Sequence, residues 1–221
     1  YKGAWESIEA LNNLSNAPLV ERSVGGSGGG GTRLTPQGEQ VLSLLRDLDT
    51  DFQGLLAAMG GGRGRFDRFY RYFQLMRRWS MKTSARNQFL GTVTKTTRGA
   101  VNSEVILDIG GGDSLACIIT NISLDNLGLA PGVEAYALIK APWVIVTTDE
   151  KLKTSARNRL CGVVSRCVAG AVNGEVIIDL PVGKSVNAII TNDSIENLGL
   201  KEGVRACALI KASHIILAVT A

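Results

Sequence analysis

Apolar residues recur at two different spacings along this 221-residue chain, and the change of spacing separates a helical N-terminal part from a strand-rich remainder. Residues 1–14 place their large apolar side chains on one helical side: Tyr1, Trp5, Ile8 and Leu11. A second helix is predicted after Thr35-Pro36, an N-cap residue followed by a first-turn proline. Its leucine-rich stripe over Val41–Leu56 is wide enough to pack against a partner helix.

Two short strands are predicted between these helices, at Leu19–Val24 and Thr32–Leu34. They flank the glycine loop Gly25–Gly31, with the sequence GGSGGGG. Helix, strand, glycine-rich loop, strand, helix is the order found in the second half of a winged helix-turn-helix. A flexible linker is the alternative for so many glycines, but the closely bracketing strands favour the wing.

The remainder of the chain is an internal duplication. Residues 82–148 align without a gap with 153–219, at a constant offset of 71, and about half of the positions are identical. Three blocks are repeated: KTSARN, IITN-x-S with NLGL, and ALIKA. Such self-similarity indicates two copies of one small folding unit.

Each copy has the pattern of short strands separated by glycine-rich turns. In the first copy these are GTVTKTT, SEVILDI and SLACIIT, with a hairpin turn at Gly110–Asp113, a capped helical turn at Ser123–Gly128 and a last strand at Val133–Thr147. Five or so strands and one short helix predict a small OB-like barrel. The predicted fold class is therefore α+β and multidomain: a partial winged helix-turn-helix followed by two OB-like barrels, which the short link Asp149–Leu152 keeps close together.

These patterns predict four segments: a partial head with a dimerisation helix at 1–59, a connecting helix at 60–80, and barrels at 81–149 and 150–221. The connecting segment contains six arginines and half of the aromatic residues of the chain, within Arg63–Trp79. We favour a helix that packs the head against the barrels. A basic contact with nucleic acid or a membrane surface and an irregular stretch are the alternatives.

Charge and cysteine content narrow the classes of function. The net charge of +4 is too small to indicate a nucleic-acid partner, and no apolar run approaches the roughly 20 residues that span a bilayer. The four cysteines form no CxxC pair, so we predict no metal site and expect buried, reduced thiols. That expectation fits a cytoplasmic protein. The four are Cys117, Cys161, Cys167 and Cys207.

The repeated blocks carry the groups that a tetrahedral dianion requires. Each copy keeps three hydroxyls, one arginine and one lysine, although half of the sequence has changed between the copies. Hydroxyls donate without adding charge, and arginine and lysine supply a planar fork and a compact cation. Each residue alone is more often structural or simply solvated, and only their joint retention favours a binding site.

The duplicated unit with TSARN, TN-x-S-x-x-NLGL and LIKAPW resembles the molybdate-binding Mop (TOBE) domains of ModE-type regulators. The resemblance implies paired barrels with oxyanion sites at subunit interfaces. It assigns the molybdate contacts to Ser84, Arg86, Thr120, Ser123, Lys140 and Ala141 in the first copy and to Ser155, Arg157, Thr191, Ser194, Lys211 and Ala212 in the second.

Two aromatic residues after the lysines differ between the copies, since Pro142-Trp143 becomes Ser213-His214. By the resemblance Trp143 lies near the ligand, and a core position is the alternative. We expect His214, the only histidine, to be structural.

The head also resembles the ModE-type family, through YKGAW, LVER and LTPQG. The first helix would be the recognition helix in the DNA major groove, which makes Tyr1 and Lys2 candidate DNA contacts. Arg22 and Arg33 flank the glycine wing and would contact phosphate. The sequence begins inside this helix, so the head is expected to be partial and to bind DNA only if a complete head is present.

The resemblance leads to one main hypothesis, a molybdate-responsive, DNA-binding regulator of molybdenum uptake or use. The alternative is a molybdate storage, buffer or transport accessory protein without DNA binding. Molybdate or tungstate is the expected effector. We expect a cytoplasmic homodimer with no membrane partner and no small-molecule substrate. No catalytic residue and hence no enzyme is predicted, because GGSGGGG lacks the lysine of a phosphate-binding loop and no nucleophile motif occurs.

Overall fold

The computed structural model describes residues 2–23, 31–57, 83–181 and 183–220. Its N-terminal elements are α1 (Lys2–Asn13), β1 (Val20–Ser23), β2 (Gly31–Leu34) and α2 (Pro36–Ala57). The strands β1 and β2 form an antiparallel hairpin, and the Thr35 hydroxyl caps α2 by accepting from the Gly38 N–H at 3.0 Å. The predicted order of helix, strand, strand, helix is therefore confirmed, while most of the glycine loop and the segment 60–80 lie outside the described residues.

The duplication appears element by element. The first copy forms β3 (Asn87–Arg98), β4 (Asn102–Gly110), β5 (Asp113–Thr120), α4 (Asn121–Asn126), β6 (Glu134–Ile139), the 3-10 turn η1 (Ala141–Trp143) and β7 (Ile145–Thr147). The second copy forms β8 (Asn158–Ala169), β9 (Asn173–Asp179), β10 (Ser185–Thr191), α5 (Asn192–Asn197), β11 (Arg205–Ile210), the 3-10 turn η2 (Ala212–His214) and β12 (Ile216–Ala218).

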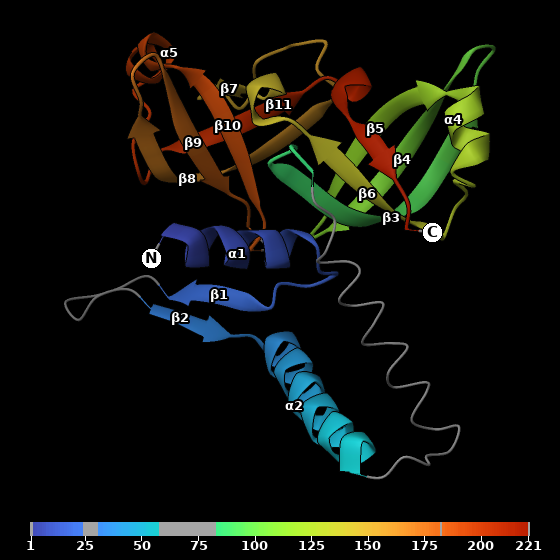
Figure 1. Cartoon of the computed structure of the whole chain (residues 1–221). Coiled ribbons are helices and arrows are strands. Elements are labelled where there is room, and N and C mark those ends of the chain that lie inside the picture. The colour runs from blue at the N-terminus through green and yellow to red at the C-terminus, as the bar shows by residue number, and fades with distance from the viewer. Residues whose placement is uncertain (1, 24–30, 58–82, 182, 221) are drawn as a thin grey trace.

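The two copies exchange their last strands. One five-stranded sheet has the order β12-β6-β3-β4-β5, and the other has the order β10-β9-β8-β11-β7. Leu217 of the second copy lies opposite Ala137 of the first, and Val146 of the first lies opposite Ala208 of the second. Figure 1 shows the exchange, with β12 in red lying among the green and yellow strands. The predicted α+β class with two curled, barrel-like sheets is confirmed, but each sheet contains residues of both copies.

One continuous hydrophobic core joins the two sheets. It contains equivalent residues of both copies, each at most 1% exposed, such as Phe89 with Leu160, Leu107 with Ile178, and Ile139 with Ile210. A unit of about 65 residues folded by itself buries only about 60% of the surface of its unfolded chain, a smaller fraction than a larger domain buries. Strand exchange enlarges the shared core and stabilises both copies.

Two local predictions for the first copy need correction. The strand predicted at Val133–Thr147 is interrupted by the 3-10 turn η1, which the second copy repeats as η2 with Ser213 in place of Pro142. The short helix begins at Asn121, and its N-cap is Thr120, whose hydroxyl accepts from the Ser123 N–H at 3.1 Å. The helix therefore begins two residues before the predicted start at Ser123 and is capped by Thr120. Gly128, with φ of 60°, follows the helix as predicted.

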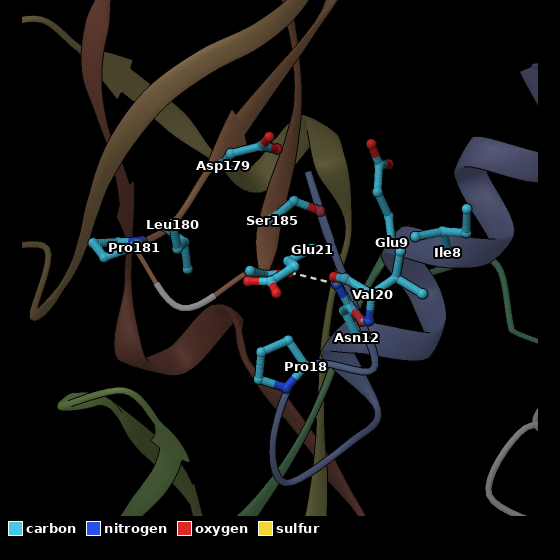
Figure 2. A pocket seen from close by; sticks show the side chains of 11 residues that line it. Ile8, Glu9, Asn12, Pro18, Val20, Glu21, Asp179, Leu180, Pro181 and Ser185 are labelled. Atoms are coloured by element: carbon cyan, nitrogen blue, oxygen red, sulfur yellow. Dashed lines mark hydrogen bonds between the residues drawn. The ribbon is translucent and has the colours of Figure 1, made fainter. Parts of the chain in front are cut away.

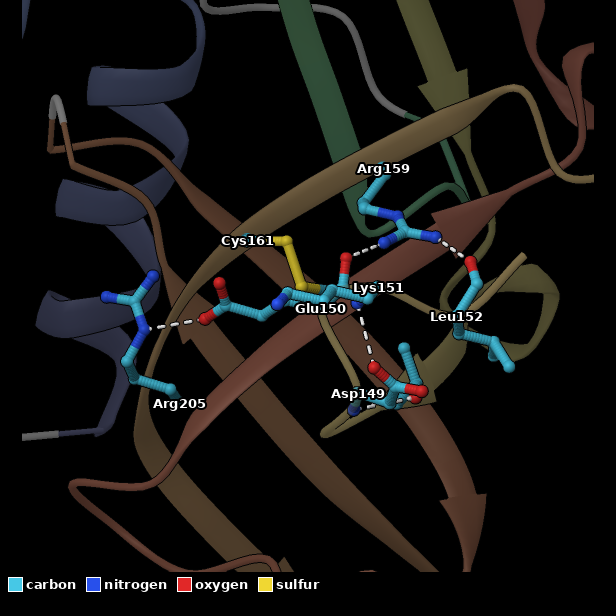
Figure 3. Close-up of a disulfide and its surroundings, with 9 residues drawn as sticks. Asp149, Glu150, Lys151, Leu152, Arg159, Cys161 and Arg205 are labelled. Atoms are coloured by element: carbon cyan, nitrogen blue, oxygen red, sulfur yellow. Dashed lines mark hydrogen bonds and ion pairs between the residues drawn. A yellow bond between two sulfur atoms is a disulfide. The ribbon is translucent and has the colours of Figure 1, made fainter. Parts of the chain in front are cut away.

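The prediction that all four cysteines are reduced is wrong for one pair. Cys161 of β8 and Cys207 of β11 are direct cross-strand partners and form a disulfide (Figure 3). The two are 46 residues apart in sequence, and only the strand register brings them together. Cys117 is a buried free thiol, and Cys167 is free and partly buried.

Helix α1 lies across the two sheets on one side (Figure 1). At its C-terminal end Leu14 packs against a small cluster that includes Ala85, Leu90 and Tyr136 of the first copy. Asn13 contacts the second copy, since its side chain accepts from the Ser185 N–H at 2.9 Å and donates to the Ser185 carbonyl at 3.0 Å. The helix is thus attached to both copies.

Asn12 joins the helix, the hairpin and the second sheet. Its Nδ2 donates to the carbonyls of Val20 (2.7 Å) and Gly183 (2.9 Å), and its Oδ1 accepts from the Leu19 N–H at 2.9 Å. Figure 2 shows Asn12 and Val20 beside a pocket of about 350 Å³ between the head and the end of β9. Within the described part of the chain, no helix has the length and apolar character needed to cross a membrane.

Candidate anion-binding site

Two asparagine side chains connect the two copies across their contact surface, which we call the seam. Asn87 is fully buried, its Nδ2 donates to the Asn187 carbonyl at 2.9 Å, and its Oδ1 accepts from the Asn187 N–H at 2.7 Å. Asn158 contacts Ala116 in the same way, at 2.9 and 2.7 Å. Both pairs are related by the offset of 71, so the copies contact each other reciprocally. Each SARN block is thereby fixed against the other copy.

The two arginines of the SARN blocks also reach across the seam. Arg86 of the first copy forms an ion pair with Glu175 of the second, and Arg157 pairs with Glu104 at 2.8 Å. The arginine side chains are 43% and 59% exposed, so both guanidinium groups lie at the surface of the seam. A solvated anion can therefore reach them.

The strand register also determines where the lysine of each copy lies relative to the arginine. Asn87 lies opposite Ile139, so Arg86 and Lys140 are the next residues on adjacent strands. Lys140 is exposed and precedes η1, which packs against β10 of the other copy, and Ala141 is buried in that turn. Arg157, Lys211 and Ala212 repeat this arrangement with η2 against β5.

The hydroxyl groups lie at the ends of β5 and β10. Thr120 and Ser123 are 2.9 Å apart between their hydroxyl oxygens, and Thr191 and Ser194 are 2.8 Å apart. Each threonine oxygen also accepts from the serine N–H. One hydroxyl proton is used inside each pair, which leaves a second proton to donate outward. The threonines are exposed and the serines are partly exposed, which suits contact with a ligand.

The strand register of β9 and β10 shows where these hydroxyls lie relative to the cations of the opposite copy. Glu175, the partner of Arg86, lies opposite Ile189, and Thr191 is two residues further along the same strand, a step of about 7 Å. The structure thus brings the first-copy cations to the same seam as Thr191 and Ser194, and the second-copy cations to the same seam as Thr120 and Ser123. Ser84 and Ser155 are exposed, three residues before β3 and β8 begin.

The aromatic pair after the lysines lies between the copies. The rings of Trp143 and His214 are equivalent by the offset of 71, and their centroids are 5.6 Å apart. Trp143 is partly buried and His214 is exposed. The sequence identified both residues but not their contact, which the strand exchange creates.

The candidate DNA contacts are only partly described. Tyr1 lies outside the described residues, and Lys2 and Arg22 lie on α1 and β1 without described side chains. Arg33 lies on β2, 75% exposed, and its Nε is 2.8 Å from a carboxylate oxygen of Glu21 on β1. This pair stabilises the hairpin and leaves part of the guanidinium open to solvent.

Glu104 and Glu175 are the seam residues that the sequence analysis missed. Both occupy the same position in the repeat and both contact an arginine of the opposite copy. Their retention in both copies is a signal visible in the sequence, but an acidic side chain by itself does not indicate an anion site. The asparagines of the SARN block were noticed as a motif without a role.

A buried lysine of the second copy lies at another place between the copies, near the turn that joins β4 and β5 of the first copy. Lys184 is 2% exposed, and its Nζ has no hydrogen-bond partner among the described residues. Burial lowers the pKa of Lys184 to about 8, while the charges of Asp108 and Asp113 act in the opposite direction. Burial also raises the pKa of Asp113. This charge group borders the head contact, since Ser185 binds Asn13.

Comparison with known proteins agrees with this architecture. The TOBE domain model matches residues 83–146 and 154–217. The molybdenum transport protein ModE of Azotobacter vinelandii is 44% identical over 99% of this chain and 82% of its own length. The molybdenum-pterin-binding protein MopA of Rhodobacter capsulatus is 43% identical with the same coverage of both chains.

A more distant relative and a solved structure extend the comparison. The DNA-binding transcriptional dual regulator ModE of Escherichia coli K12 is 35% identical over 99% of this chain and 82% of its own length. A crystal structure of the cytoplasmic molybdate-binding protein ModG with molybdate bound is 48% identical. It superposes with a TM-score of 0.62 and covers 63% of this chain and 100% of ModG.

Proposed function

The chain belongs to the ModE family of tandem TOBE-domain proteins, and we propose that it binds molybdate at the seam between its two copies and regulates transcription in response. The observation that supports the proposal is the reciprocal seam, where the strand register brings an arginine and a lysine of one copy to the same contact surface as the hydroxyls of the other. Each set contains two cations and one paired glutamate, and the positive charge that remains favours a dianion. The hydroxyls supply donors from another direction, as a tetrahedral ligand requires.

Each proposed site draws on both copies. Six residues form the first site, namely Ser84, Arg86, Lys140 and Ala141 with Thr191 and Ser194. The second site contains Ser155, Arg157, Lys211 and Ala212 with Thr120 and Ser123. Tungstate has the same charge and shape and should compete for both sites. Such a site binds its ligand and performs no chemistry on it, so we propose an effector-binding protein and not an enzyme.

The contacts of α1 support a link between ligand and head. The strand β10 begins at Ser185, which Asn13 of α1 contacts, and it ends at Thr191 in the proposed site. Leu14 packs against the cluster that contains Ala85, and Ala85 lies in the sequence between the proposed ligand residues Ser84 and Arg86. Molybdate that binds one arrangement of this seam more tightly would shift the population of head orientations.

We further propose a homodimer in which α2 supplies part of the contact, and DNA as the regulated partner. The amphipathic stripe of α2 and the DNA-binding relative support these two assignments. A cytoplasmic location is proposed by analogy with ModG, which is described as a cytoplasmic protein. Capture of genomic DNA fragments with and without molybdate would separate a regulator from a simple molybdate-binding protein.

Substitution of the two seam arginines tests the binding site. By calorimetry, Arg86→Ala or Arg157→Ala should each remove about half of the molybdate sites. The double variant should lower affinity by at least ~100-fold, because hydrogen bonds to a charged group contribute about 1.5–3 kcal/mol each. Arg205→Ala is the matched control, since Arg205 pairs with Glu150 away from the seam and is 64% exposed. A double variant that keeps its fold and binds within a few-fold of wild type would refute the assignment.

A further inference from the structure

Two carboxylates occupy equivalent places on the arginines of the seam. Glu104 lies on β4 and Glu175 on β9, and each contacts the SARN arginine of the opposite copy. The glutamate side chains are 25% and 20% exposed, so they are more buried than the arginines that they contact. Glu175 is also 3.8 Å from Arg166. These glutamates therefore lie within the seam and are not incidental surface partners.

A carboxylate and an oxyanion bind a guanidinium group through the same kind of hydrogen bonds. Both accept from the N–H groups of the planar fork, and both prefer two parallel hydrogen bonds. An incoming dianion must therefore displace the carboxylate from the guanidinium or bind beside it. Displacement breaks an existing ion pair, and binding beside it brings like charges close together.

We propose that Glu104 and Glu175 are affinity-setting residues, which compete within the chain for Arg157 and Arg86 and weaken oxyanion binding at both sites. This inference rests on the proposed function, because it concerns the same two sites. The glutamates raise the oxyanion concentration at which the seam becomes occupied. Their competition matches the affinity of the site to a signalling role, in which the ligand must also dissociate.

The opposite role makes the opposite prediction. If the glutamates served mainly to hold the arginines in the correct orientation, their removal would leave the guanidinium groups less ordered and would weaken oxyanion binding. The sign of the change in affinity therefore decides between competition and positioning. Neither role depends on the chemistry of the head or on DNA.

The experiment measures sodium molybdate binding by calorimetry at low ionic strength for the whole chain. Glu104→Gln and Glu175→Gln should each tighten binding at one site by about 10-fold. Glu104→Ala and Glu175→Ala should do the same, and they address the possibility that the glutamine amide oxygen still contacts the arginine. Circular dichroism melting checks that every variant is folded.

Glu150→Gln is the matched control, because it removes one negative charge from an arginine pair that is outside the seam. Its affinity for molybdate should equal that of the wild type. Unchanged or weaker molybdate binding in the folded Glu104 and Glu175 variants would overturn this proposal. If the wild-type protein still binds molybdate in that case, the proposed function stands. Absence of molybdate binding in the wild type and in all variants would instead overturn the proposed function.

Discussion

The contact between Asn87 and the other copy supports a quantitative prediction. Asn87→Ala removes three hydrogen bonds of a fully buried side chain, two to Asn187 and one to the Ile139 carbonyl at 3.3 Å. Asn187 itself is buried, so water cannot readily replace the lost partner. The substitution therefore acts on the seam between the copies and not on one strand alone.

The expected magnitude follows from the groups left without partners. A buried donor or acceptor that loses its partner costs about 1–3 kcal/mol. The two shortest of the lost bonds leave the N–H and the carbonyl of Asn187 without this partner, and the small cavity left by the side chain adds to the cost. The free energy of unfolding should fall by about 2–6 kcal/mol. With a urea dependence of roughly 2 kcal/mol per M, the unfolding midpoint would shift by roughly 1–3 M.

Urea unfolding followed by circular dichroism provides the measurement. Asn158→Ala, the equivalent change in the second copy, should cost a similar amount, because Asn158 contacts Ala116 with the same geometry. Asn126→Ala is the control. Asn126 is exposed on α4, and its replacement should change the free energy of unfolding by less than about 0.5 kcal/mol. A loss below about 1 kcal/mol for Asn87→Ala would refute the inference that these side chains hold the copies together.

Three further predictions concern the disulfide, the two free cysteines and the buried lysine. Reduction of the Cys161–Cys207 disulfide should lower the free energy of unfolding by about 2–4 kcal/mol. Thermal melting with and without reductant measures this change. The Cys161→Ala variant is the control, because it should no longer respond to reductant. Burial raises the pKa of Cys117 to about 12, so alkylation of the native protein at pH 8 should label Cys167 and spare Cys117; labelling of both at equal rates would contradict it. The Lys184 pKa of about 8 lies below the ordinary 10.5, so the unfolded chain binds more protons between these values and stability should rise from pH 8 to 10.5. Lys184→Met should remove this rise and stabilise the protein by about 1–3 kcal/mol at pH 7. Urea unfolding at pH 7, 8 and 10.5 measures both effects. A loss of stability at pH 7 would show that the charges of the nearby aspartates outweigh the effect of burial.

Much of the local structure could be predicted because it depends on neighbours in sequence. Thr35 and Pro36 begin α2 by capping and by a restricted backbone angle, and both effects act within one turn. The glycines at 110–112 adopt positive φ values and form the predicted hairpin turn. The errors at Ser123 and at Val133–Thr147 are also local, since a threonine three residues earlier is the cap and a proline turn interrupts the strand.

Contacts between distant residues were not predictable in this way. Cys161 and Cys207 have no spacing that indicates a disulfide, and they meet because β8 and β11 are adjacent in one particular register. The same holds for the pairing of Arg86 with Glu175, residues on opposite copies. A repeat shows that two units exist, but not which strands they share.

The sequence by itself determined the elements, the duplication and the residue types of the candidate site, because turn chemistry, apolar periodicity and repeated motifs depend on short stretches of chain. Tertiary structure alone decided that β7 and β12 are exchanged, that cations of one copy lie on the same seam as hydroxyls of the other, and that glutamates occupy the arginines. These outcomes depend on how two half-complete sheets bury the most apolar surface together. That quantity belongs to the assembled core and not to any segment of the chain.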